Sequence, residues 1–249
     1  MKKSLSCGLA TLVAMASAFV SPALAQMPRA NSSSTTTAND AEAAYTRAIN
    51  GRADAILALL ELKDEAAANR VHAIIVAQYR ALRAWHDAHD AEVKRLTKAT
   101  HNSDPDQANE ARDELRQVEA SLKSVHDQYL NQLSADLTAD QIEKVKDKMT
   151  YNKVKVTYDA YCEIVPGLTD EEKAQMLMWL KEAREIAMDA GSAEEKSAVF
   201  NKYKGKINNY LTARGHNVSQ AYKDWGEKQR AKARARSAAP QGDAQAAKP

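Results

Sequence analysis

One helical pattern decides the fold class of this chain, and it spans residues 64–98, DEAAANRVHAIIVAQYRALRAWHDAHDAEVKRLTK. Its large side chains recur at alternating steps of four and three residues, the spacing of a helix that packs along one seam, as in a coiled coil. Two histidines occupy seam positions at which an aliphatic residue would be ordinary. The seam consists of Ile75, Tyr79, Leu82, His86, His89, Val93 and Leu96. We therefore expect a long amphipathic helix here.

Helical patterns continue on both sides of this stretch. A helix is predicted from Asp40 to about Leu62, and the polar segment 102–105 precedes a third helix that ends near residue 134. A connection this short favours an antiparallel hairpin over about 64–134. The predicted fold is all-α, with about seven helices and no convincing strand, in which the long hairpin packs with a C-terminal bundle of shorter helices. These shorter elements are expected at about 138–149, within 151–165 as a turn and a brief helix, at 169–190, at 192–215, and through Tyr222 into the tail.

Three of the shorter helices open with the same local signal. Thr138, Thr169 and Ser192 are each followed three residues later by Gln or Glu. In such a capping box the hydroxyl and the carboxylate or amide each accept a backbone N–H bond at the helix start. The pattern therefore predicts three helix N-termini at these positions.

The N-terminus has the pattern of a secretory signal peptide. Met1 is followed by two lysines, residues 9–20 are apolar and small, and Ala23 and Ala25 are the small residues that a signal peptidase reads. We expect cleavage of residues 1–25, after Ala25, which would place the protein in the periplasm or outside the cell; an uncleaved anchor is the alternative. The mature chain would then hold a single cysteine, Cys162, and no intramolecular disulfide.

Composition divides the rest of the chain into a helical body with two polar flanks. Residues 26–39 are expected to be a disordered linker, 40–230 a single helical domain, and 231–249 a disordered tail with basic and Ala/Pro-rich parts. The stretch 40–225 carries 26 Lys+Arg and 31 Asp+Glu, a net charge of −5, so the body is acidic and the tail basic. A mean hydropathy of −0.56 excludes an integral membrane protein. The tail either binds anionic envelope polymers or is a solvated helix end, and no nucleic-acid partner is expected.

The histidines of the long helix are candidate metal ligands. His86 and His89 are three residues apart and share one helix face, so both imidazoles could bind one divalent metal. In an antiparallel hairpin the facing helix would bring Glu119 near them as a third ligand. The alternative, which we favour, is that both histidines pack in the seam and form hydrogen bonds, with no cofactor bound.

A second candidate site lies in the C-terminal half, where six of the nine tyrosines are found. Tyrosine combines an apolar ring with a hydroxyl, which suits a groove for a polar ligand such as a stacked sugar. Glu185 and Asp189 are four apart on one helix face, and paired carboxylates perform glycoside hydrolysis. The alternative is that Arg184 and Asp189 bridge helices. The candidate ligand-binding residues are Tyr151, Tyr158, Arg184, Glu185, Asp189, Lys204, Lys206, Asn208, Asn209 and Tyr210.

Several stretches together resemble the DUF3826 family. They are KMTY at 148–151, VTY at 156–158, LT at 168–169, ARE at 183–185, AMDAGS at 187–192 and KYKGKINNYL at 202–211. The resemblance extends over about residues 43–225 and is weakest at 98–111. The resemblance implies that the protein is one of a family of exported bacterial proteins, often met in genomes rich in polysaccharide-degrading systems. The family has no established catalytic residues that could be assigned to positions of this chain.

The sequence leaves the function open among three classes. The first is an exported helical binding protein associated with polysaccharide metabolism. The second is a carbohydrate-active enzyme that uses Glu185 and Asp189 or the histidine pair. The third is a periplasmic chaperone of the Spy type, because LTADQ at 137–141 is similar to the Leu-Thr-x-x-Gln element of those proteins. A phosphate-binding glycine loop, a G-x-S-x-G elbow and an H-E-x-x-H motif are all absent from the sequence.

Overall fold

The protein is helical throughout the part of the chain that the computed structural model describes, residues 32–238. This part contains eight helices and no strand, so the all-α prediction is confirmed, whereas the count of about seven was one too low. The difference lies in 151–165, where the expected turn and brief helix is a regular helix of 12 residues. The helices are α1 (Ser32–Leu60), α2 (Glu65–Ala99), α3 (Pro105–Leu133), α4 (Ala139–Met149), α5 (Lys153–Ile164), α6 (Asp170–Met188), α7 (Ala193–Ala213) and α8 (Val218–Ala238).

The chain divides into two units between Ala43 and Ala44. The described part of the first unit is helical and comprises residues 32–43. The second unit contains the rest of α1 and helices α2 to α8, and all contacts described below lie within it. No helix of the described residues is both long and apolar enough to cross a bilayer.

Both ends of the helical body differ from the prediction. Helix α1 begins at Ser32 and α8 continues to Ala238, so parts of the segments expected to be a disordered linker and tail are helical. Extending an existing helix adds one hydrogen bond per residue without a new nucleation cost, and the Ala, Lys and Arg residues of the tail are strong helix formers. The signal peptide, its cleavage site and residues 239–249 lie outside the described residues.

Side-chain caps explain where the helices begin. The three predicted capping boxes are confirmed, with reciprocal bonds between Thr138 and Gln141, Thr169 and Glu172, and Ser192 and Glu195. Asp64 and Asp104 cap α2 and α3, and Pro105 occupies the first turn of α3, where a missing N–H costs nothing. Local sequence therefore sets most of the helix starts.

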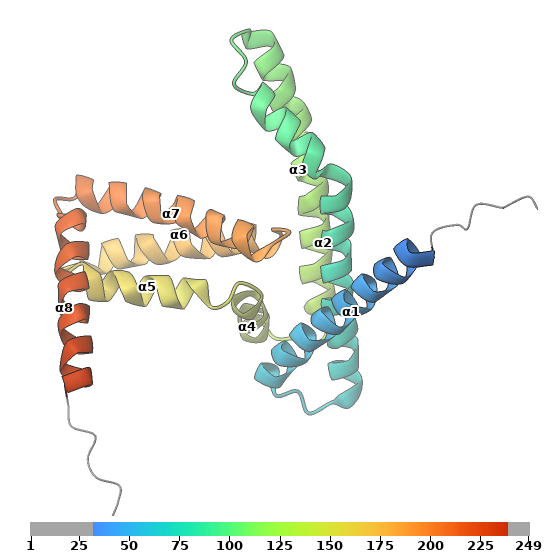
Figure 1. Ribbon diagram of the computed structural model, residues 1–249, viewed down its shortest axis with the longest axis horizontal. Helices are drawn as coiled ribbons and strands as arrows, with labels where there is room; N and C mark the ends of the chain where they lie inside the picture. The colour runs from blue at the N-terminus through green and yellow to red at the C-terminus, as the bar shows by residue number, and fades with distance from the viewer. Residues whose placement is uncertain (1–31, 239–249) are drawn as a thin grey trace, which may run out of the picture. The chain divides into compact units, whose positions relative to one another are not determined.

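Helices α2 and α3 lie side by side (Figure 1). The indole Nε1 of Trp85 donates a hydrogen bond of 2.8 Å to Ser121 Oγ across the pair. Near the far end of the pair, Arg95 and Glu114 form an ion pair of 3.2 Å. Residues later in α2 thus face residues earlier in α3, so the two helices run in opposite directions.

Two hydrophobic cores hold the second unit together. The first is formed by α1, α2, α3 and α4, with Ile56, Ile75, Leu133 and Val145 at its centre. The second is formed by α5, α6, α7 and α8, and includes Leu180, Phe200 and Ile207. Helix α6 contributes to both, because Met188 at its end belongs to the first core while its earlier apolar residues belong to the second. The end of α6 is therefore where the two cores meet.

Candidate functional site

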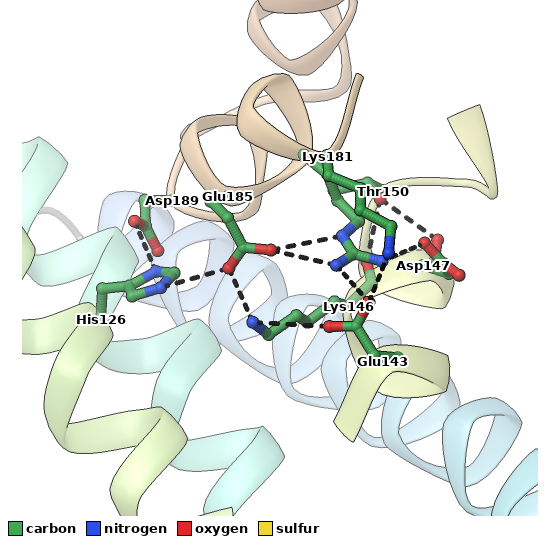
Figure 2. A network of polar contacts seen from close by, with 9 residues as sticks. His126, Glu143, Lys146, Asp147, Thr150, Lys181, Glu185 and Asp189 are labelled. Carbon is green, nitrogen blue, oxygen red and sulfur yellow. Dashed lines mark hydrogen bonds and ion pairs between the residues drawn. The ribbon is translucent and has the colours of Figure 1, made fainter. Parts of the chain in front are cut away.

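A network of charged side chains connects α3, α4 and α6 at the end of α6 (Figure 2). Its centre is the guanidinium of Arg184, whose side chain is only 3% exposed. Arg184 donates to Asp147 Oδ1 at 2.7 Å, to Glu143 Oε2 at 2.8 Å and to Glu185 Oε1 at 3.1 Å. Burial alone would lower the pKa of Arg184, but hydrogen bonds to Asp147 and Glu143 outweigh it and raise that pKa. A buried cation is thus neutralised by carboxylates from two helices.

His126 of α3 joins the same network from the other side. Its Nδ1 lies 2.9 Å from Asp189 Oδ2, and its Nε2 lies 3.6 Å from Glu185 Oε2 (Figure 2). The contact with Asp189, followed by the contact with Glu185, raises the pKa of His126 to about 9. His126 is therefore an imidazolium at neutral pH, and it bridges α3 to the end of α6.

Glu185 is the carboxylate shared by the two halves of the network. Lys146 Nζ donates to Glu185 Oε2 at 2.8 Å, on the same oxygen that faces His126. Burial alone would raise the pKa of Glu185, but the contacts with His126 and Lys146 outweigh it and lower that pKa to about 2. Glycoside hydrolysis needs one carboxylic acid that stays protonated at working pH, and Glu185 does not. The network is arranged to hold helices together.

A cavity of about 490 Å³, which we call the basic cavity, lies between α1, α2, α7 and the turn that joins α4 to α5. Three cationic side chains line it, and among the described residues around it none is Asp or Glu. Two tyrosine rings and an asparagine amide complete its polar lining. Its full lining is Ala48, Gly51, Arg52, Ala55, Ile56, Tyr79, Lys148, Met149, Tyr151, Asn152 and Lys196.

Lys196 is the most buried of the three cations. The residue is only 6% exposed. Its Nζ donates hydrogen bonds to the backbone carbonyls of Ala187 and Met188, at 2.9 and 3.0 Å. Those carbonyls end α6, so the ammonium also satisfies the negative end of that helix. Burial lowers the pKa of Lys196 to about 8; Asp189 and Glu195 act against this shift through space, and Arg52 adds to it. The site thus holds an ammonium for which no carboxylate of the lining compensates.

Arg52 and Tyr79 form the wall of the cavity opposite the α4–α5 turn. The guanidinium of Arg52 lies 5.4 Å from the centre of the Tyr79 ring, within range of a cation–π contact. No Asp or Glu of the described residues forms an ion pair with Arg52 or Lys148 in this structure. Burial raises the pKa of Tyr79 to about 12, so its phenol stays protonated and can donate a hydrogen bond.

The turn between α4 and α5 has unusual backbone geometry. Tyr151 and Asn152 both have positive φ, 58° and 54°, which costs a non-glycine residue about 1 kcal/mol or more. The turn is closed by a hydrogen bond of 2.8 Å from the Asn152 amide to the Asp147 carbonyl. This conformation leaves the Tyr151 side chain 52% exposed at the cavity. Strained backbone in a cavity wall is a common mark of a functional site.

A family model described as "Protein of unknown function (DUF3826)" matches residues 46–231. The chain belongs to the DUF3826 family. The matched range contains every residue of the charged network and of the basic cavity. A comparison with curated proteins finds no match.

The residues that the sequence predicted for one ligand groove lie in different parts of this DUF3826 protein. Arg184, Glu185 and Asp189 meet in the charged network, as the helix-bridging alternative proposed. Tyr151 lines the basic cavity, and Tyr158 lies in α5 beside Cys162.

The other five residues of that prediction are on α7. The hydroxyl of Tyr161 donates to Asn208 Oδ1 at 2.6 Å and to the Lys204 carbonyl at 3.1 Å, which ties α5 to α7. Lys206 lies over the Trp179 ring, at 4.5 Å from its centre, and Tyr210 meets the same ring edge-on. Asn209 is exposed. The structure therefore does not bring these residues together with Tyr151 or Arg184.

The predicted metal ligands have other partners. His86 Nδ1 lies 2.8 Å from Asp90 Oδ1, and its Nε2 lies 2.7 Å from the Asp189 carbonyl. His89 stacks on Trp85 at 4.8 Å between ring centres, and Glu119 is exposed. Within residues 32–238 no three His, Cys, Asp or Glu side chains are grouped so that they could hold a metal ion.

Five polar cavity residues were not recognised as site residues from the sequence: Arg52, Tyr79, Lys148, Asn152 and Lys196. One of them carried a usable signal. Lys196 stands at the start of an apolar stripe that continues with Phe200, Tyr203, Ile207 and Leu211, and a lysine at a core position is rare unless it has a special partner. His126 was likewise missed, because nothing in its local sequence distinguishes it from an exposed helical histidine.

Proposed function

We propose that this protein is an exported helical binding protein whose ligand site is the basic cavity and whose ligand is a saccharide. The observation that carries the proposal is the cavity itself, which has the size of a small-ligand site and combines tyrosine rings with several N–H donors. The proposal includes export to the periplasm or beyond the cell by cleavage after Ala25, a role in polysaccharide metabolism, and no cofactor or nucleic-acid partner.

The chemistry of the lining supports a saccharide. A sugar presents C–H faces that pack against aromatic rings and hydroxyls that exchange hydrogen bonds with polar side chains. Tyr79 and Tyr151 supply rings, and the Asn152 amide supplies both a donor and an acceptor. The half-exposed ring of Tyr151 lies where an entering ligand would meet it first.

The proposal takes the arrangement expected from the sequence, a long hairpin packed with a bundle of shorter helices, as the scaffold of the site. The charged network holds α4, which contributes Lys148 and Met149 to the cavity, against α6 through Arg184 and Asp147. Asp147 also accepts the amide of Asn152, so the same residue anchors the strained turn. The positions of Lys148 and Tyr151 therefore depend on the network.

The two other functional classes have less support. The low pKa of Glu185 speaks against an acid/base pair with Asp189. A chaperone cradle would need a broad apolar face. The exposed large hydrophobic residues are instead distributed over α1, α5, α6, α8 and the α4–α5 turn: Leu59, Tyr151, Val156, Met178, Ile186 and Tyr222.

A glycan array followed by calorimetry tests the proposal. The exported chain should bind one class of saccharide, and Tyr151→Ala should weaken that binding by about fivefold or more, since a ring contact contributes about 1 kcal/mol or more. Tyr222→Ala, which removes another exposed tyrosine on α8, is the matched control and should leave binding unchanged. Sugar release during the assay would favour the enzyme, and suppression of client aggregation without saccharide binding would favour the chaperone.

A further inference from the structure

The basic cavity concentrates positive charge within an acidic body. Arg52, Lys148 and Lys196 come from three different helices and converge on one space, yet residues 40–225 carry a net charge of −5. Like charges brought together repel one another unless an anion lies between them. The arrangement is therefore unfavourable in the empty protein and favourable once a negative group is bound.

We propose that the ligand of the basic cavity is anionic, and that Arg52, Lys148 and Lys196 together bind its carboxylate or other oxyanion group. Only the sugar part of the ligand rests on the proposed saccharide function. With that function, the anionic ligand is an acidic sugar, a uronate. The charge preference itself follows from the lining alone.

The carboxylates nearest to the cavity are already engaged. Asp147 accepts from Arg184, and Asp189 lies against His126. Glu195 accepts the backbone amide of Ser192 at 3.1 Å as part of its capping box. None of these carboxylates lines the cavity, and although Asp189 and Glu195 act on Lys196 from a distance and offset part of its charge, the direct partner of the three cations has to come with the ligand.

Donor groups remain available for an oxyanion. The ammonium of Lys196 has three N–H bonds, of which two are directed to the carbonyls that end α6. The guanidinium of Arg52 lies 5.4 Å from the centre of the Tyr79 ring and has five N–H donors, whose fork geometry suits a bidentate contact with a carboxylate. Charge-assisted hydrogen bonds of this kind are about twice as strong as neutral ones.

The N-terminus of α5 adds a smaller positive potential to that of the three cations. Asn152, which lines the cavity, is the N-cap of α5, and its side chain makes no capping hydrogen bond. The positive end of the helix dipole therefore lies at the cavity wall without the usual side-chain acceptor. A bound oxyanion would supply the missing acceptor.

The neighbouring cavity provides a contrast within the same protein. It has a volume of about 360 Å³ and shares Arg52 and Tyr79 with the basic cavity, but Arg83, His86, Asp87, Asp90 and Glu195 also line it. Its three carboxylates offset these cations, so this space has no comparable excess of positive charge. The charge difference between the two spaces thus selects the basic cavity for an acidic ligand.

Calorimetry with a matched pair of ligands tests the inference. Digalacturonate and its dimethyl ester have nearly the same shape and differ in charge, so the acid should bind at least about tenfold more tightly. Arg52→Gln should weaken binding of the acid by about tenfold and binding of the ester by less than about twofold, because only the acid offers an oxyanion. Arg47→Gln, an exposed arginine of α1 that does not line the cavity, is the control and should behave like the wild type.

The outcomes separate this inference from the proposed function. If acid and ester bind equally and Arg52→Gln affects neither, the anion inference is overturned while the saccharide function stands. If inorganic phosphate or sulfate binds in an Arg52-dependent way and no sugar does, the anion inference stands and the saccharide function is overturned. If none of these probes binds to the folded protein, both are overturned.

Discussion

The charged network and the basic cavity are both rich in cations, but they balance their charge in opposite ways. In the network the cationic side chains of Arg184, Lys146 and His126 each lie within 3.1 Å of a carboxylate. In the cavity three cations face one space without an acidic side chain. A cation whose partner is supplied by the fold stabilises the fold, whereas a cation without such a partner is available to a ligand. The comparison therefore distinguishes cations that stabilise the fold from cations that are available to bind a ligand.

The largest effect is expected from removing the centre of the network. Arg184→Met would leave Glu143, Asp147 and Glu185 without their shared cation, and loss of one partner of a buried ion pair costs about 3 kcal/mol. Urea denaturation should show a decrease of that size in the free energy of unfolding. Lys181→Met is the control, because Lys181 is half exposed and 4.0 Å from Glu143, and its loss should cost less than about 0.5 kcal/mol. A loss below about 1 kcal/mol for Arg184→Met would contradict a structural role.

A smaller and pH-dependent effect is expected at His126. The folded state raises the pKa of His126 from 6.5 to about 9, so it binds the proton more tightly than the unfolded chain does. The resulting stabilisation is complete below pH 6.5 and is lost as the pH rises through about 9. His126→Asn should therefore be less stable than the wild type by about 2 kcal/mol at pH 6, and this difference should shrink by pH 9.5.

Urea denaturation at both pH values measures that difference. His101→Asn, in the exposed turn between α2 and α3, is the matched control and should follow the wild type at both values. The role of His126 as a charged bridge between Glu185 and Asp189 is refuted by a stability difference that does not change between pH 6 and pH 9.5.

The smallest effect on stability is expected from Arg52→Gln in the basic cavity. The substitution breaks no ion pair among the described residues, so the free energy of unfolding should change by less than about 0.5 kcal/mol without ligand. It also removes a positive charge that lowers the pKa of Lys196. That pKa should therefore rise from about 8, but the rise should be smaller than the decrease that burial causes. Urea denaturation and an NMR titration of the Lys196 side chain measure the two quantities. A loss above about 1 kcal/mol would make Arg52 a structural residue like Arg184.

Local patterns explain which parts of the fold could be predicted. The capping boxes at Thr138, Thr169 and Ser192 depend on residues three apart, and each formed as expected. The last helix was expected to run into the tail, and α8 does so as far as Ala238, because Ala, Arg and Lys favour a helix although residues from 231 on read as polar and low in complexity. The count of about seven helices is too low; the segment 151–165, expected to be a turn and a brief helix, contains the regular 12-residue helix α5.

The candidate site was only partly predictable. Arg184 and Asp189 were recognised as charged residues that could bridge helices, yet their partners His126 and Asp147 could not be identified from sequence spacing. The metal hypothesis for His86 followed from helical spacing alone. In the structure the imidazole lies against the end of α6 and contacts the backbone carbonyl of Asp189. Side-chain spacing in the sequence cannot predict a contact with a backbone group.

By itself the sequence determined the fold class, most of the helix starts and the family, because each depends on residues that are close together in the chain or on a stretch recognised as a whole. Only the tertiary structure decided which charges are paired. Arg52 and Lys196 reach the same cavity from α1 and α7, and their proximity depends on how two hydrophobic cores pack at the end of α6. Helical periodicity shows which face of each helix is apolar, but the side chain that meets a given cation is set by packing between helices distant in sequence.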